Sequence, residues 1–123
     1  MIWLAVALGG ALGAMGRYTV GLMLPTTSGH FPWSTLIVNV IGSALMGLCY
    51  VLLIEKGVVN IHWRPFLMVG ILGALTTFSS FALDAILLWQ QGENSQAVIY
   101  AATSLIACIA AALISMQVAQ KIF

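Results

Sequence analysis

Residues Gly70–Phe81 read GILGALTTFSSF, and this stretch decides the fold of the chain. It lies inside a long apolar segment, yet it carries two glycines and four hydroxyl side chains. Lipid offers backbone groups no hydrogen-bond partners, and glycine weakens helices, so an ordinary membrane helix has little reason to contain such a run. Two explanations are open. Small residues can allow close helix packing, or a broken helix can present hydroxyls and freed carbonyls to an ion.

The composition of the whole chain is that of a membrane protein. Of its 123 residues, 62% are hydrophobic and 6% are charged, and the mean hydropathy is +1.09. These values exclude an ordinary soluble domain. Four apolar segments of about membrane length follow one another, at Ile2–Leu24, Trp33–Ile54, Phe66–Trp89 and Ala97–Val118. The sequence therefore predicts one all-α membrane domain over residues 1–123, with four transmembrane helices joined by short turns.

The charges give only a weak indication of orientation. Four spans would put both termini and the second loop on one side, together with Lys56, Arg64 and Lys121, whereas Arg17 lies nearer the other side. The positive-inside rule then favours cytoplasmic termini by only a couple of charges. So weak a bias permits insertion in both orientations. A bundle of 13.1 kDa also has too little interior to bury Arg17 beside a water-lined path, which favours a dimer.

Several polar and aromatic side chains share one half of the bilayer. At the helical rise, Arg17 lies about 10 Å and Asn39 about 9 Å from the face that bears the first loop. By the same estimate, the residues in this half are Arg17, Asn39, Phe78, Phe81 and Ser104, and those near the midplane are Gly73 and Thr76. Each alone has an explanation as an interfacial, packing or lipid-facing residue. Their shared depth favours a common polar path.

This path suits a small anion better than a cation. Asp84 is the only acidic residue within the four segments, and Arg17 gives the entrance a positive potential. The hydrogen-bond donors are Asn39, Thr77, Ser79, Ser80, Tyr100 and Ser104. Phe78 and Phe81 can turn the positive edges of their rings toward an anion. An enzyme is not predicted, because no nucleophile–base pair or metal-ligand cluster can be assembled from the sequence.

Three motifs resemble, in order, those of the Fluc (CrcB-type) fluoride channel family. They are GGALGAMGRY at Gly9–Tyr18, TLIVNVIG at Thr35–Gly42, and the stretch Gly70–Phe81. The resemblance covers essentially the whole chain. It implies an antiparallel, dual-topology homodimer in the bacterial cytoplasmic (inner) membrane, with two separate pores and a third helix broken near mid-membrane. The implied function is passive export of cytoplasmic fluoride, which relieves fluoride toxicity.

The resemblance also implies roles for individual residues. Phe78 and Phe81 would line the pores, Asn39 would lie beside them, and Arg17 would lie near the vestibule. Further residues on the polar track would be Thr35, Tyr100 and Ser104, in addition to the hydroxyls of Thr77, Ser79 and Ser80. The backbone carbonyls of Gly73 and Thr76 from both subunits would hold a structural sodium ion (Na+). The implied partners are fluoride, a second copy of the chain and the lipid bilayer, with no nucleic acid.

Four positions differ from the family's usual pattern, namely Ser34, Ser80, Asp84 and Cys108. Asp84 replaces a glutamate, and Cys108 stands where a serine often continues the polar track. Two other functions stay open. A small multidrug-resistance-type transporter would need an acidic residue in the first span, where this chain has Arg17. A non-transporting subunit that only scaffolds a partner would need no aligned hydroxyls at mid-membrane.

Overall fold

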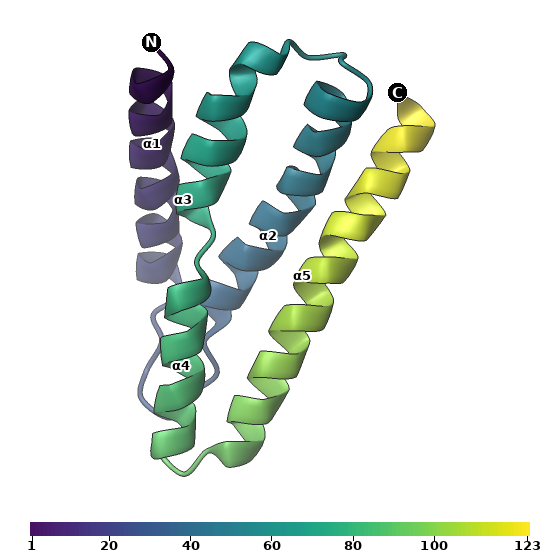
Figure 1. Ribbon diagram of the computed structural model, residues 1–123. Coiled ribbons are helices and arrows are strands. Elements are labelled where there is room, and N and C mark those ends of the chain that lie inside the picture. The colour runs from purple at the N-terminus through teal and green to yellow at the C-terminus, as the bar shows by residue number, and fades with distance from the viewer.

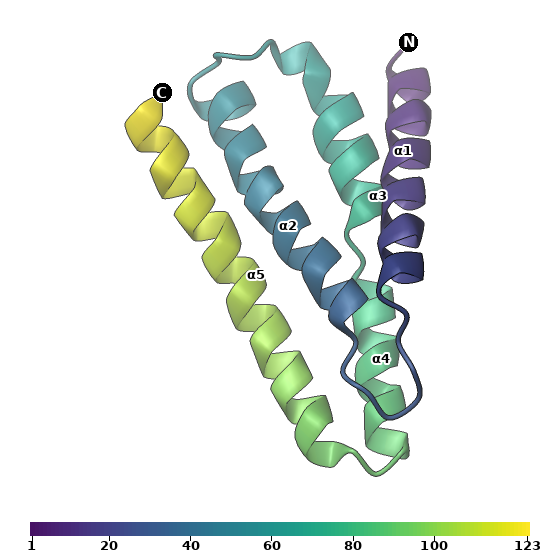
Figure 2. The same ribbon diagram turned by 180° about the vertical axis from the view of Figure 1, so that it is seen from behind.

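The computed structural model describes residues 1–123 and consists of helices and their connections (Figure 1). The prediction of an all-α chain is confirmed. The long helices are α1 (Ile2–Met23), α2 (Trp33–Cys49), α4 (Phe78–Gln90) and α5 (Asn94–Ile122). The shorter elements are the π-type turns η1 (Tyr50–Glu55) and η3 (Pro65–Leu72), the 3-10 turn η2 (Ile61–Trp63), and α3 (Gly73–Leu75). Both termini lie at the same end of the molecule (Figures 1 and 2).

Three helical stretches are long and apolar enough to cross a membrane. They are Trp33–Glu55, Ile61–Gln90 and Asn94–Ile122, with mean hydropathies of 2.3, 1.9 and 2.3. They contain the second, third and fourth predicted spans. The first predicted span forms α1, which at 22 residues has sufficient length but does not reach the same hydropathy. The cause is its composition, because Arg17 and several glycines dilute its apolar residues.

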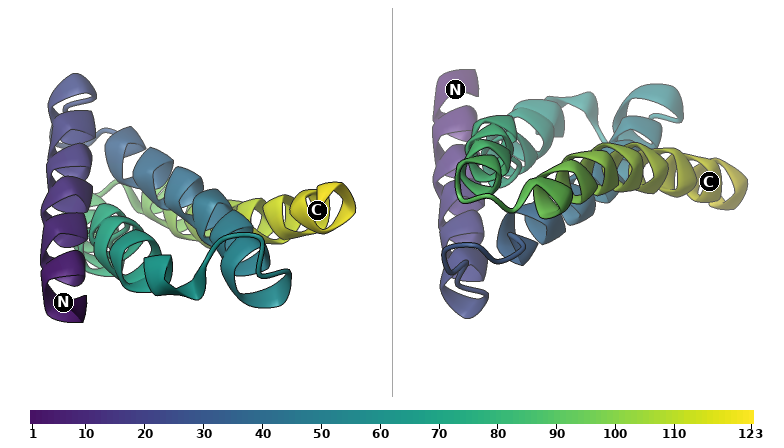
Figure 3. Two further views of the ribbon diagram at one scale, coloured as in Figure 1. Left: turned by 90° about the horizontal axis from the view of Figure 1, so that it is seen from above. Right: turned by 90° about the horizontal axis from the view of Figure 1, so that it is seen from below.

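The helices form an open arrangement rather than a closed bundle. α1 packs along η3 and α3, whereas α5 packs along α2 and α4. α1 and α5 make no contact with each other and lie at opposite edges of the molecule, which is elongated in the end views (Figure 3). Only 17 of the 123 residues are buried. A single chain therefore leaves most of its apolar surface to lipid or to another subunit.

Glycines bring α1 and η3 into backbone contact. A Cβ on Gly9 would overlap the carbonyl oxygen of Phe66, and a Cβ on Gly70 would lie 2.8 Å from the Cα of Gly9. Only glycine fits at such a crossing, as in other close contacts between membrane helices. Gly10 faces open space instead, with nothing within 4 Å of a Cβ built on it. Small residues of the first and third segments thus pack against each other within one chain.

The third apolar segment is interrupted between α3 and α4. Thr76 and Thr77 have extended backbones, with φ/ψ of −79°/153° and −153°/113°. The Thr76 hydroxyl donates to the Leu72 carbonyl at 2.8 Å, and the Thr77 hydroxyl accepts from the Ser80 N–H at 3.1 Å. Each threonine therefore caps one of the two helix ends that meet here. Figure 1 shows the non-helical link between α3 and α4.

Candidate functional site

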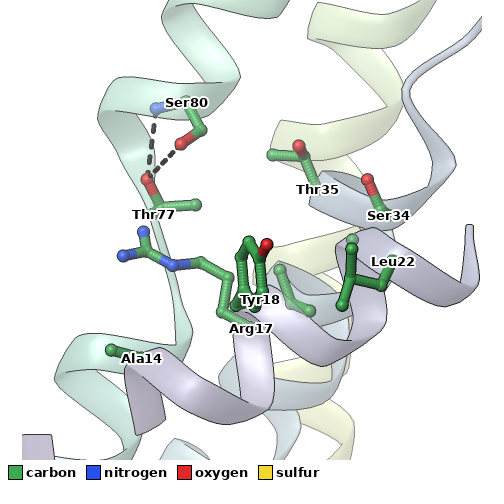
Figure 4. Close-up of a pocket in the computed structure, with 10 residues that line it drawn as sticks. Ala14, Arg17, Tyr18, Leu22, Ser34, Thr35, Thr77 and Ser80 are labelled. Atoms are coloured by element: carbon green, nitrogen blue, oxygen red, sulfur yellow. Dashed lines mark hydrogen bonds between the residues drawn. The ribbon is translucent and has the colours of Figure 1, made fainter. Parts of the chain in front are cut away.

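Two cavities lie on either side of this interruption. The larger, the Arg17 cavity, has a volume of about 510 Å³ and lies between α1, α2 and the start of α4 (Figure 4). Its polar lining residues are Arg17, Tyr18, Ser34, Thr35, Thr77 and Ser80. The smaller, the Ser104 cavity, has a volume of about 240 Å³ and lies between α2, α4 and α5. It is lined by Asn39, Ser43, Thr76, Thr77, Phe78, Phe81, Ser104, Leu105, Cys108 and Ile109. Thr77 lines both cavities and so forms part of the wall between them.

The charge of the two cavities comes from a single side chain. Arg17 is the only charged residue that lines the Arg17 cavity, and no charged residue lines the Ser104 cavity. Figure 4 shows the Arg17 guanidinium directed to the side of the cavity on which Thr77 and Ser80 lie. The first cavity is therefore electropositive, and the second is neutral and partly aromatic.

The Asn39 side chain binds the backbone of the interruption. Its Nδ2 donates to the Thr77 carbonyl at 3.0 Å, and its Oδ1 accepts from the Thr77 N–H at 2.7 Å. The sequence predicted Asn39 as a donor for the permeating ion. In the structure its acceptor and one of its two N–H groups are occupied by Thr77, so one N–H remains. This contact between residues 38 positions apart could not be seen in the sequence.

The three hydroxyls at the start of α4 bond to one another. Thr77 Oγ1 donates to Ser80 Oγ at 3.0 Å and lies 3.3 Å from Ser79 Oγ. The Thr77 hydroxyl has a single proton, which it donates to Ser80. Ser79 is therefore the donor in the hydrogen bond between Thr77 and Ser79. The Ser80 hydroxyl accepts here and keeps its own proton, and Ser80 lines the Arg17 cavity. Of the three predicted donors, Ser80 is thus the one with a free proton.

Two residues predicted to lie on the polar track converge on a carboxylate. Thr35 Oγ1 donates to Asp84 Oδ2 at 2.7 Å, and the Tyr100 hydroxyl donates to the same oxygen at 3.2 Å. Tyr100 is fully buried. Sequence reasoning did not place Asp84 among the site residues, although its position as the only acidic residue within the apolar segments was a usable signal. Asp84 links α2, α4 and α5 at one end of the site.

Ser104 is the one buried side chain whose polar atom has no partner. It is 5% exposed, and its Oγ makes no hydrogen bond within the chain. A buried hydroxyl left without a partner costs about 1–3 kcal/mol, so such groups usually have a reason to persist. Cys108 lines the same cavity one turn further along α5. The free hydroxyl of Ser104 is therefore a candidate ligand-binding group.

Three aromatic rings form a continuous row beside this cavity. The ring centroids of Phe78 and Phe81 are 5.3 Å apart at 46°, and those of Phe81 and Tyr100 are 5.4 Å apart at 44°. Phe78 is 74% exposed although it is a large apolar residue. The two phenylalanines predicted to line a pore thus lie together, and the first of them lies on the open surface of the chain.

The interruption also changes the partners of two backbone carbonyls. In a continuous helix the Gly73 carbonyl would accept from the Thr77 N–H, which here donates to Asn39 Oδ1. The Thr76 carbonyl would accept from the Ser80 N–H, which here donates to Thr77 Oγ1. Side-chain oxygens therefore take the donors that the Gly73 and Thr76 carbonyls would have in a helix. Gly73 is exposed on the surface of the chain.

Comparison with known proteins gives full-length matches. Residues 4–116 match the family described as CrcB-like protein, Camphor Resistance (CrcB). A protein named fluoride-specific ion channel FluC from Aeromonas salmonicida (strain A449) is 49% identical, over 94% of this chain and 93% of that protein. Proteins of the same name from Saccharophagus degradans (strain 2-40) and Paracoccus denitrificans (strain Pd 1222) are 43% and 42% identical, over 99% and 98% of this chain. These alignments cover 92% and 96% of the two relatives.

Proposed function

This chain belongs to the family of CrcB-like proteins, as its three motifs predicted, and we propose that it is a fluoride-selective ion channel. It exports cytoplasmic fluoride by passive electrodiffusion and so reduces fluoride toxicity. The observation that carries the choice of ion is the full-length similarity to relatives named fluoride-specific ion channels. It is a channel and not an enzyme.

The electrostatics of the two cavities support an anion. Arg17 lines the first cavity and raises the anion concentration at the entrance. It does not line the Ser104 cavity, where a cationic side chain would bind fluoride too strongly for conduction. No carboxylate lines either cavity. Fluoride therefore meets an attractive vestibule first and a neutral passage after it.

The free hydroxyl protons support an order of binding steps. A bare anion in an apolar medium costs tens of kcal/mol, so each step must replace lost water with hydrogen-bond donors. Ser80 offers a free proton to the Arg17 cavity, and Ser104 offers one to the Ser104 cavity. Phe78 and Phe81 line the Ser104 cavity together with Ser104, and their ring edges supply a weak positive field that does not trap the ion. Fluoride passes from Ser80 in the Arg17 cavity to Ser104 in the Ser104 cavity, beside the rings of Phe78 and Phe81.

The open shape of the chain supports a dimer with two pores. Phe78 is 74% exposed beside the Ser104 cavity, so a partner subunit is needed to close the passage against lipid. The weak charge bias of Lys56, Arg64 and Lys121 against Arg17 permits the antiparallel pairing of two chains in the bacterial inner membrane. Tags on the termini should then be reached from both sides of the membrane in one population. A single uniform orientation would contradict this pairing.

A structural sodium ion fits the freed carbonyls. Gly73 and Thr76 present backbone oxygens whose helical donors are engaged elsewhere, and oxygens without formal charge suit a hard monovalent cation. Gly73 lies on the exposed surface, where a second subunit could bring equivalent oxygens. The ion would supply positive charge that compensates these carbonyl dipoles and ties the interrupted helices of two subunits together.

Fluoride efflux from liposomes tests the proposal. Purified protein is reconstituted into vesicles loaded with potassium fluoride or potassium chloride, and efflux is followed with a fluoride- or chloride-selective electrode after a potassium ionophore is added. We expect rapid fluoride efflux and little release from vesicles loaded with chloride. A folded, reconstituted protein that releases no fluoride, or releases both anions equally, would overturn the proposed function.

A further inference from the structure

The Thr77 amide has a choice of two acceptors. Thr77 is buried at 7% exposure, and its N–H bonds to an acceptor within the chain. In a helix this N–H would bond to the Gly73 carbonyl, and in the structure it bonds to Asn39 Oδ1 at 2.7 Å. A buried N–H favours one of these acceptors, because an unsatisfied buried donor is costly. Whichever acceptor Thr77 uses, the other is left free.

Asn39 is favoured over the Gly73 carbonyl as the partner of Thr77, because Asn39 binds Thr77 at two points. Its Nδ2 donates to the Thr77 carbonyl at 3.0 Å while its Oδ1 accepts from the Thr77 N–H. The two bonds hold the peptide groups on both sides of Thr77 in the extended conformation, with φ/ψ of −153°/113°. An alkyl side chain of similar size could make neither bond.

Gly42 forms a second contact with the interruption, one turn further along α2. A Cβ on Gly42 would overlap the Cγ2 methyl of Thr76. Residues three positions apart lie on the same face of a helix, so Asn39 and Gly42 face the interruption together. Gly42 leaves room for the Thr76 side chain, whose hydroxyl closes the end of the preceding helix at the Leu72 carbonyl.

We propose that Asn39 and Gly42 position the interruption so that the Gly73 carbonyl stays free for a cation, and that Asn39 is a positioning residue for this cation site. The inference rests on the proposed sodium site. Asn39 accepts the Thr77 N–H in place of Gly73, and Gly42 lets α2 approach closely enough for this contact. The wall of the Ser104 cavity and the cation site are then coupled, because Asn39 lines the first and controls the second.

The sodium dependence of thermal stability tests this coupling. Melting of the detergent-solubilised protein is followed by tryptophan fluorescence, with sodium chloride titrated against N-methylglucamine chloride. For wild type we expect stabilisation by sodium, since a ligand that binds only the folded state raises its stability. For Asn39→Leu the sodium concentration at half-maximal stabilisation should rise about tenfold or more, because Thr77 returns to the Gly73 carbonyl. Gly42→Ala should shift it in the same direction.

Two further variants separate positioning from general damage. Asn39→Asp keeps the oxygen acceptor for the Thr77 N–H but loses the donor to the Thr77 carbonyl, so its sodium midpoint should lie between those of wild type and Asn39→Leu. Asn60→Ala removes another side chain that accepts a backbone N–H, here from His62 at 2.9 Å in the η2 turn, and should lower stability equally at all sodium concentrations. An unchanged sodium midpoint in Asn39→Leu would overturn the inference.

A wild-type protein without any sodium effect would overturn both this inference and the sodium site. The proposal that the chain is a fluoride channel is tested separately, by fluoride efflux. The two failures are therefore distinguishable.

Discussion

Replacing Ser104 by alanine should change stability and conduction in opposite directions. The Ser104 hydroxyl is buried at 5% exposure and has no partner within the chain. Removing an unsatisfied buried hydroxyl relieves a desolvation cost of about 1–3 kcal/mol, so Ser104→Ala should be about 1 kcal/mol more stable than wild type without fluoride. A hydrogen bond to an ion contributes about 1.5–3 kcal/mol, and its loss should slow fluoride efflux about 10- to 150-fold.

Ser115→Ala is the matched control on the same helix. Ser115 lies three turns further along α5, and its hydroxyl donates to the Ala44 carbonyl at 2.6 Å. Removing a satisfied interhelical hydrogen bond should cost about 0.6 kcal/mol and leave fluoride efflux unchanged. The two variants therefore differ in the sign of their effect on stability, which general disturbance of α5 cannot produce.

Chemical unfolding in detergent and efflux from liposomes measure the two quantities. The reasoning is refuted if Ser104→Ala conducts like wild type and loses stability as Ser115→Ala does. The Ser104 hydroxyl would then be a packing group, and fluoride would have to cross the Ser104 cavity on other donors.

Five further variants test other parts of the structure. Phe78→Ile and Phe81→Ile keep an apolar side chain but remove the ring edges, so fluoride efflux should fall sharply while the protein still folds. Normal fluoride efflux in both variants would show that the rings serve only in packing. Gly9→Ala should lower the free energy of unfolding by about 1–3 kcal/mol, because its Cβ overlaps the backbone of η3. Gly10→Ala should be neutral or stabilising by up to about 1 kcal/mol. Equal effects of the two variants would contradict the close contact. Asp84→Ala should destabilise the protein by about 1.5–3 kcal/mol for each of the two hydroxyls that lose their acceptor, and an unchanged unfolding midpoint would speak against this network.

Local features of the chain could be predicted well from the sequence. The apolar segments predicted the long helices, because a residue's preference for lipid does not depend on its tertiary neighbours. The run of glycines and hydroxyls in Gly70–Phe81 indicated an irregular stretch, and both capping contacts there span four residues or fewer, Thr76 to Leu72 and Thr77 to Ser80. Such contacts follow from rules that act along the chain. The first segment was also predicted as a span and forms α1, although its mean hydropathy is below that of the other three.

The partners of the polar side chains were decided only by the tertiary structure. Asn39, Thr35 and Tyr100 were all predicted to lie along the path of an ion, because the sequence shows what a side chain can donate but not which groups lie close to it. Folding brings Asn39 to the Thr77 backbone, and brings Thr35 and Tyr100 to Asp84, across separations of 38, 49 and 16 residues. Ser104 remains free because no acceptor or donor from another helix reaches it. A free hydroxyl is a property of the space around it, and that space exists only once the helices have packed.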